Sequence, residues 1–107
     1  MINMEVFEKK EQLNLLFDLY HELLTEKQVL YFELYYREDY SLQEIAENYG
    51  LSRNAVYDHL KKVEEHLNDY EQKLGLLDKR NKRQELLDKM ESSFDESLIE
   101  QLRKLDE

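Results

Sequence analysis

The chain of 107 residues carries 25 Asp and Glu against 15 Lys and Arg, which gives a formal net charge of -10. This length suits one modest hydrophobic core, and the absence of cysteine excludes disulfides, thiolate metal sites and cysteine nucleophiles. The absence of proline, with only two glycines, favours an all-α fold, while the net acidity counts against a strong, sequence-independent grip on phosphates.

The sequence offers no sign of export, of a membrane span or of catalysis. The amino-terminal stretch MINMEVFEKKEQ has charges where a signal peptide needs apolar residues, and no apolar run approaches the roughly 20 residues that span a bilayer. We therefore expect a cytoplasmic protein without membrane insertion. His21, His59 and His66 lack the spacing and company of metal ligands, and no Gly-rich phosphate loop or activated nucleophile occurs. We expect neither a cofactor nor an enzyme.

Two helices are predicted in residues 1–40. The first runs from about Phe7 to Leu24, and its apolar stripe consists of Leu13, Leu16, Phe17, Tyr20, Leu23 and Leu24. Thr25 and Gln28 then form a capping-box pattern, which predicts a helix from Glu26 to about Tyr36. Its inner side should carry Val29, Leu30, Phe32 or Leu34. The tyrosines of YFELYY suit core and core-rim packing better than a base-stacking platform.

The stretch SLQEIAENYGLSRNAVYDHL, residues 41–60, has the pattern of a helix-turn-helix. Ser41 and Glu44 repeat the capping-box signal, and Leu42, Ile45 and Ala46 form the inner face of the first helix. Gly50 stands where a left-handed turn residue is needed, Leu51 should pack beneath the corner, and Ser52 caps the next helix.

From Val56 onward the apolar residues follow a heptad spacing. They are Val56, Leu60, Val63, Leu67, Tyr70, Leu74 and Leu77. Beyond Leu67 this seam has no partner inside the helix-turn-helix, so we expect it to pack on the chain's own tail or on a second copy. We predict a homodimer formed through the C-terminal helices. Gly75 is expected to end or bend the helix.

We divide the chain into a helical domain, residues 1–74, with the helix-turn-helix at residues 41–68, and a C-terminal helical extension, residues 75–107, that is a candidate dimerisation tail. The extension begins with a basic patch that could contact nucleic acid or an acidic patch on another copy of this protein, or be merely solvated: Lys79, Arg80, Lys82 and Arg83. After a break at ESSFDES, a last helix should run from Leu98 to Leu105 with Leu98, Leu102 and Leu105 aligned. A solvated, half-ordered end is the alternative.

In a helix-turn-helix the second helix enters the major groove of DNA. If Val56, Leu60 and Val63 face the core, the outward candidates for DNA binding are Arg53, Asn54, Tyr57, Asp58, Lys61 and Lys62. Arg53 suits a guanine edge, Asn54 an adenine, and Lys61 and Lys62 phosphates. Asp58 repels phosphate, but it can accept from a cytosine amino group or orient Arg53 or Lys62. The face is mixed, so we expect DNA binding to be weak and salt-dependent, and a simple solvated surface is the alternative.

Residues 23–67, with LTEKQ, SLQEIA and LSRNAVYDHLKK, resemble region 4 of the σ70 family of RNA polymerase factors, which reads the -35 promoter element. Residues 6–77, including LNLLFDLYHELLTEKQ and YEQKL, resemble more closely the YlxM family of small bacterial proteins. That resemblance implies an all-α, σ region 4-like helix-turn-helix without a wing, a DNA-binding or regulatory role and a link to the signal recognition particle. Tyr57 and Asp58 depart from the more basic residues typical of promoter-reading helices.

Two functions follow as hypotheses. The first is a DNA-binding regulatory protein that acts as a homodimer. The second is an adaptor that binds protein or RNA of the signal recognition particle machinery and does not bind DNA, which the acidity of residues 1–40, four Lys and Arg against nine Asp and Glu, would suit.

Overall fold

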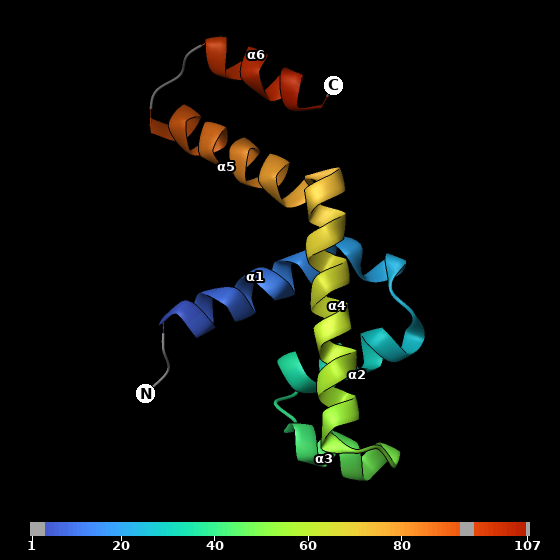
Figure 1. Ribbon diagram of the computed structural model, residues 1–107. Helices are drawn as coiled ribbons and strands as arrows, with labels where there is room; N and C mark the ends of the chain where they lie inside the picture. The colour runs from blue at the N-terminus through green and yellow to red at the C-terminus, as the bar shows by residue number, and fades with distance from the viewer. Residues whose placement is uncertain (1–3, 93–95, 107) are drawn as a thin grey trace. The chain divides into compact units, whose positions relative to one another are not determined.

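In a computed structural model, which describes residues 4–92 and 96–106, every regular element is a helix (Figure 1). The elements are α1 (Met4–Tyr20), the 3-10 turn η1 (His21–Leu23), α2 (Glu26–Tyr36), α3 (Leu42–Tyr49), α4 (Arg53–Leu74), α5 (Leu76–Ser92) and α6 (Glu96–Leu105). The predicted all-α class is confirmed. Contacts divide the chain into two compact units, residues 1–73 and 74–107. None of the described helices combines the length and apolar character needed to cross a bilayer.

Helix α1 buries one face and ends earlier than the sequence predicted. Its buried residues are Leu13, Leu16, Phe17 and Tyr20. After Tyr20 the chain tightens into the 3-10 turn η1, which breaks the 3.6-residue period. Leu23, predicted on the buried stripe, is therefore 55% exposed, and that part of the prediction was wrong.

Helix α2 begins and ends where the sequence predicted. The Gln28 N–H donates to Thr25 Oγ1 at 3.2 Å, and the Thr25 N–H donates to Gln28 Oε1 at 2.9 Å, so both arms of the capping box are present. The helix buries Tyr31, Phe32 and Leu34, and Tyr35 and Tyr36 are half-buried, which confirms the core and core-rim assignment of the tyrosines. Leu30, one of the alternatives for the inner side, is exposed.

Aromatic and charged contacts join α2 to α1. The rings of Phe17 and Phe32 stack with centroids 4.2 Å apart. The Arg37 guanidinium lies 4.7 Å above the Phe17 ring and pairs with the Asp18 carboxylate at 2.5 Å. A cation held between an aromatic face and a carboxylate is thus part of this fold.

The apolar seam of α4 finds its partner in α1 and η1. Leu67 is fully buried, and the Tyr70 ring lies 5.9 Å from that of Tyr20. The Tyr70 hydroxyl donates to the Leu23 carbonyl at 3.3 Å, and the Tyr20 hydroxyl donates to Glu71 Oε1 at 2.7 Å. For Tyr70 the expectation that the seam packs on the tail or on a second copy was therefore wrong, whereas Leu74 is 50% exposed and its partner stays a prediction.

The second unit is a helical hairpin of α5 and α6 (Figure 1). Gly75, with φ of +64°, separates α4 from α5, so it ends the helix as the sequence allowed. Leu77 consequently lies on α5 and the continuous heptad through it was wrong. A helical tail is confirmed, and α6 buries Leu98 and half-buries Leu102 and Leu105. The predicted break at ESSFDES falls partly outside the described residues, at 93–95.

Candidate nucleic-acid interface

Helix α3 is the first helix of the motif, and its start is set by a capping box. The Glu44 N–H donates to Ser41 Oγ at 3.0 Å, and the Ser41 N–H donates to Glu44 Oε1 at 3.1 Å. These two bonds satisfy donors that a helix start leaves unpaired. With the start fixed, Ile45 and Ala46 both face inward and are buried.

The turn between the helices depends on Gly50. Its φ of +66° is left-handed, and its N–H donates to the Ala46 carbonyl, which also accepts from the Leu51 N–H at 2.9 Å. Nothing lies within 4 Å of the position a Cβ would take, so the backbone conformation, not space, favours glycine. Ser52 Oγ then accepts from the Ala55 N–H at 3.1 Å and caps α4. The predicted turn and cap are confirmed.

A small core holds the two helices together from behind. Val56 and Val63 have no exposed surface and Leu60 is 6% exposed, which confirms their inward orientation. Val56 and Leu60 join Ile45 and Ala46 in one buried cluster, and Tyr31 and Leu34 of α2 complete it. The core fixes which face of α4 points outward.

The outward face of α4 carries the six predicted DNA-binding residues. All are exposed: Arg53, Asn54, Tyr57, Asp58, Lys61 and Lys62. They lie within the first three turns of α4, where a recognition helix meets base edges. Their role as DNA contacts stays a prediction.

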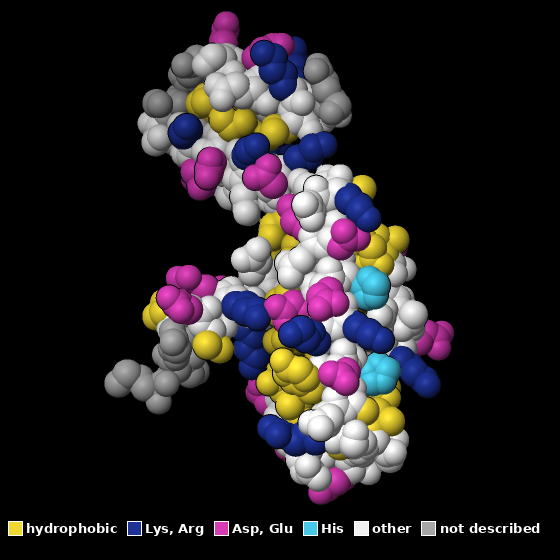
Figure 2. All heavy atoms as spheres, viewed as in Figure 1, with side chains coloured by type: hydrophobic (Ala, Val, Ile, Leu, Met, Phe, Trp, Pro, Cys, Tyr) yellow, Lys and Arg dark blue, Asp and Glu magenta, His cyan; other side chains and the backbone are white. Residues whose placement is uncertain are grey.

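The charge of this face is mixed. Three cations, Arg53, Lys61 and Lys62, share the exposed surface of α4 with Asp58 and Glu65. Figure 2 shows the resulting dark blue and magenta side chains interspersed along α4. Among the described residues no ion pair links Asp58 to Arg53 or Lys62, so the cations of the face remain available to a ligand.

The secondary basic patch lies on α5, in the other unit. Lys82 pairs with Asp78 at 3.0 Å, and Arg83 pairs with Asp106 at 3.4 Å. Lys79 and Arg80 are exposed. Two of the four cations of the patch are thus already matched by carboxylates of their own unit.

The three histidines differ in exposure. His21 and His66 are exposed, and His59 is half-buried with its ring 5.2 Å from that of Tyr31. A histidine one turn before the buried Val63 lies at the edge of the core. The described part of the chain contains no group of three side chains that could hold a metal ion.

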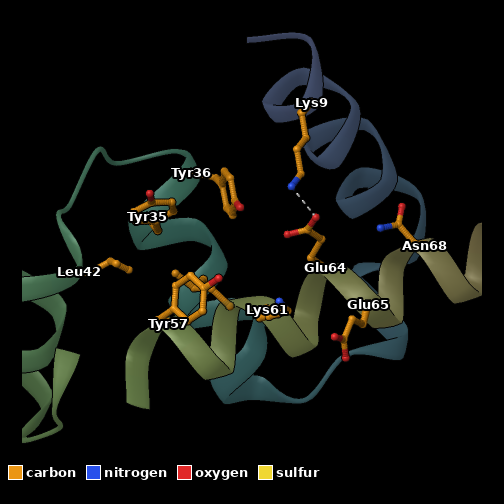
Figure 3. A pocket seen from close by; sticks show the side chains of 10 residues that line it. Lys9, Tyr35, Tyr36, Leu42, Tyr57, Lys61, Glu64, Glu65 and Asn68 are labelled. Carbon is orange, nitrogen blue, oxygen red and sulfur yellow. Dashed lines mark ion pairs between the residues drawn. The ribbon is translucent and has the colours of Figure 1, made fainter. Parts of the chain in front are cut away.

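A pocket beside the outward face was not anticipated from the sequence. It encloses about 300 Å³, and its walls include Lys9, Tyr35, Tyr36, Tyr57, Lys61 and Glu64 (Figure 3). Two of these, Tyr57 and Lys61, belong to the predicted DNA-binding set. The walls come from α1, α2, α3 and α4, and no local sequence pattern signals a cavity built from four separate helices.

Comparison with known proteins agrees with this architecture. The sequence model of the family UPF0122, described as "Putative helix-turn-helix protein, YlxM / p13 like", matches residues 7–105. The UPF0122 protein YlxM of Bacillus subtilis is 48% identical over 107 residues, covering 92% of this chain and 97% of the relative. The UPF0122 protein lin1916 of Listeria innocua is 47% identical over 110 residues, covering 94% of this chain and all of the relative. Because a helix-turn-helix is built at residues 41–74 and the match spans nearly the whole sequence, the chain belongs to the YlxM/p13-like helix-turn-helix family.

Proposed function

We propose that this protein is a DNA-binding regulatory protein that reads the major groove with α4, as a σ region 4-like helix-turn-helix without a wing. One observation carries the proposal: the first three turns of α4 are held outward by a core of buried residues behind them. This arrangement leaves a whole helix face free to enter a groove wide enough for one helix.

The outward residues divide by chemistry into base readers and phosphate contacts. Arg53 can donate two hydrogen bonds to guanine, and Asn54 can pair with adenine. Lys61 and Lys62 lie farther along α4, where side chains reach phosphates. Asp58 repels phosphate and accepts only from a cytosine amino group. A face with three cations among acidic neighbours binds duplex weakly. The slope of log binding constant against log salt concentration should be no steeper than about -3 per copy.

A homodimer would raise the affinity by presenting two such faces to one duplex. The second unit supports this part of the proposal, since Leu74, Leu76 and Leu87 are exposed there. Leucines that the hairpin does not bury itself are available to another copy. Molar mass of the full chain in solution tests this step directly.

Fluorescence anisotropy with a labelled random duplex tests DNA binding at low salt. We expect micromolar binding that weakens steeply between about 50 and 200 mM salt. Arg53→Glu should abolish it, because the variant loses a cation and gains a repulsive carboxylate on the groove face. Lys27→Glu, on the exposed start of α2, is the control with the same change of charge and should bind as the parent does.

Two results would refute the DNA proposal. One is the absence of binding at low salt and high protein concentration. The other is equal binding by Arg53→Glu and Lys27→Glu, which would show that the affinity for duplex depends on net charge and not on the α4 face.

A second candidate is an adaptor of the signal recognition particle machinery that binds its protein or RNA and leaves DNA alone. The observation that favours it is the exposed acidity of the α4 face, where Asp58 and Glu65 lie among the cations. Such a face suits a basic protein partner better than a polyanion. Co-purification of the particle after nuclease treatment, together with the absence of duplex binding, would favour the adaptor.

A further inference from the structure

The pocket beside α4 contains one ion pair, and its two partners differ in their exposure. Lys9 Nζ of α1 lies 2.8 Å from Glu64 Oε1 of α4, and the two reach toward each other across the pocket (Figure 3). The Lys9 side chain is 64% exposed, whereas that of Glu64 is only 26% exposed. The carboxylate is therefore part of the pocket wall, while the lysine approaches it from the solvent side. An ion pair with one such exposed partner contributes little to stability and can open.

Glu64 makes this pocket favourable for a positive charge. Its hydrogen bond and its charge raise the pKa of Lys9 above the ordinary value. Burial first, and then the Glu64 carboxylate, raise the pKa of Tyr36 to about 12, so the phenol stays neutral. The rise for Lys9, and the smaller part of the rise for Tyr36 that the Glu64 charge causes, have the sign expected beside a carboxylate.

Aromatic rings also contribute to the wall. Tyr36 lies opposite Glu64, and Tyr57 lies on α4 beyond Lys61, about two turns before Glu64 (Figure 3). Within the described chain the Tyr36 and Tyr57 hydroxyls make no hydrogen bond, in contrast to that of Tyr20, which is bound to Glu71. Ring faces attract cations, and free hydroxyls can bind whatever enters.

The protein already binds one of its own guanidinium groups in this way. Arg37 lies over the Phe17 ring and pairs with the Asp18 carboxylate. The pocket also combines aromatic rings with a carboxylate, but the partner of Glu64 is the point charge of Lys9. A planar guanidinium can stack on a ring and bond a carboxylate with two parallel N–H groups, which an ammonium cannot do.

We propose that this pocket binds an arginine-type guanidinium group from outside the chain, which displaces Lys9 from Glu64. Once Lys9 is displaced, the remaining charged walls are Lys61, Glu64 and Glu65, with a formal net charge of -1, so a monocation restores neutrality. The volume of about 300 Å³ lies at the small end of ligand pockets and suits one side chain better than a nucleotide. The net charge of -10 would also attract a cation.

The proposal does not depend on DNA binding, although the two sites adjoin. Tyr57 and Lys61 line the pocket and also belong to the proposed groove face. The guanidinium group has two sources, a free arginine-like molecule or an arginine side chain within another protein. Both sources would make the same contacts in the pocket, and the experiment below distinguishes between them.

Titration of the full-length protein with N-acetyl-L-argininamide, followed by amide chemical shifts in NMR spectra, tests the proposal. We expect saturable shifts at Tyr36, Tyr57 and Glu64, and none with N-acetyl-L-citrullinamide, which has the same shape but no charge. Glu64→Gln should weaken binding about tenfold because it removes the charged acceptor. Lys9→Ala should strengthen binding about threefold, since it removes the resident competitor.

Titration with two further ligands identifies the source of the guanidinium group. Tighter binding of a glycine- and serine-flanked arginine peptide than of free L-arginine would indicate a side chain of another protein, and the reverse order would indicate a free molecule. Equal shifts with the citrulline analogue, unchanged affinity in Glu64→Gln, or weaker binding in Lys9→Ala would each overturn the proposal. The citrulline comparison uses the unaltered protein, so it holds even if a variant fails to fold.

Discussion

The helix-turn-helix unit, residues 1–73, and the helical hairpin, residues 74–107, are both built from charged, leucine-rich helices, yet they differ in what they bury. Among the described residues of the hairpin only Leu77, Leu86 and Leu98 are buried, and the rest of the buried apolar residues lie in the first unit. In α5 the run DKRNKRQE separates two leucine pairs, so about two turns carry no apolar side chain. Helix propensity thus forms helices in both units, but the spacing of apolar residues decides which unit has a substantial core.

This difference in burial suits the two units to different roles. The first unit has a core that can hold the outer face of α4 in one orientation, as a recognition surface requires. The hairpin is smaller than the roughly 40 residues below which chains seldom fold on a core alone. Its exposed leucines at Leu74, Leu76 and Leu87 therefore suit further burial, which is why we propose it as the dimer contact.

The largest expected effect comes from comparing one buried leucine in each unit. Leu67→Ala, in the first unit, should lower the free energy of unfolding by about 3 kcal/mol, because Leu67 is fully buried and its removal leaves a cavity. Leu86→Ala, in the hairpin, should leave the unfolding of the first unit nearly unchanged. Urea unfolding followed by tyrosine fluorescence measures this, since all eight tyrosines lie in residues 1–73. Equal losses in both variants would mean that the units unfold as one.

Alanine substitutions at the two glycines should give a smaller difference in stability between the units. Gly50→Ala should destabilise the first unit by about 1 kcal/mol, because an L-residue is strained at a φ of +66° even where space is open. Gly75→Ala meets a similar φ of +64°, but at the boundary of the units, and should not shift the tyrosine-monitored midpoint. Gly50→Asn is the matched control, since asparagine tolerates the left-handed region better and should cost less than alanine. A larger loss from Asn than from Ala would contradict this account of the turn.

The smallest expected effect is a loss of folding stability at alkaline pH, and it is confined to the first unit. The folded-state pKa of Tyr36 is raised to about 12 from 10.0, chiefly by burial, so the neutral phenol favours the folded state. This stabilisation is complete below pH 10 and is lost as the pH rises toward 12. Tyr36→Phe should therefore lose less stability than the parent between pH 10 and 12, and the difference between them should be constant below that window. If the free energies of unfolding of the parent and of Tyr36→Phe ran parallel up to pH 12, Tyr36 would not titrate as described. Solvent reaches the half-buried phenol and screens its interactions, so the loss of stability stays well below what the full pKa difference implies.

Sequence reasoning succeeded where the determinants are local. Ser41 with Glu44, Thr25 with Gln28, and Gly50 each act within one turn of chain, and each predicted cap or turn is present. The inward set of Val56, Leu60 and Val63 follows from helical period alone. The exposure of the six candidate DNA-binding residues of α4 follows from the same period, although exposure does not establish what they bind.

Sequence reasoning failed where the partner lies far along the chain. The late seam of α4 was assigned to the tail or to a second copy, but Tyr70 meets Tyr20 and the Leu23 carbonyl instead. The 3-10 turn after α1, which exposes Leu23, places that carbonyl in reach. Contacts separated by about fifty residues have no periodic signature, because they depend on how whole helices cross.

The amino-acid sequence by itself determined the helical class, the helix starts at the capped positions, the left-handed turn at Gly50 and the inner face of α4, because these depend on backbone hydrogen bonds and side-chain spacing within a few residues. Only the tertiary structure decided that α1 covers the far end of α4 and that Lys9 meets Glu64 beside Tyr36. Those contacts arise when separate helices pack, and their geometry is set by the shape and burial of every side chain between them.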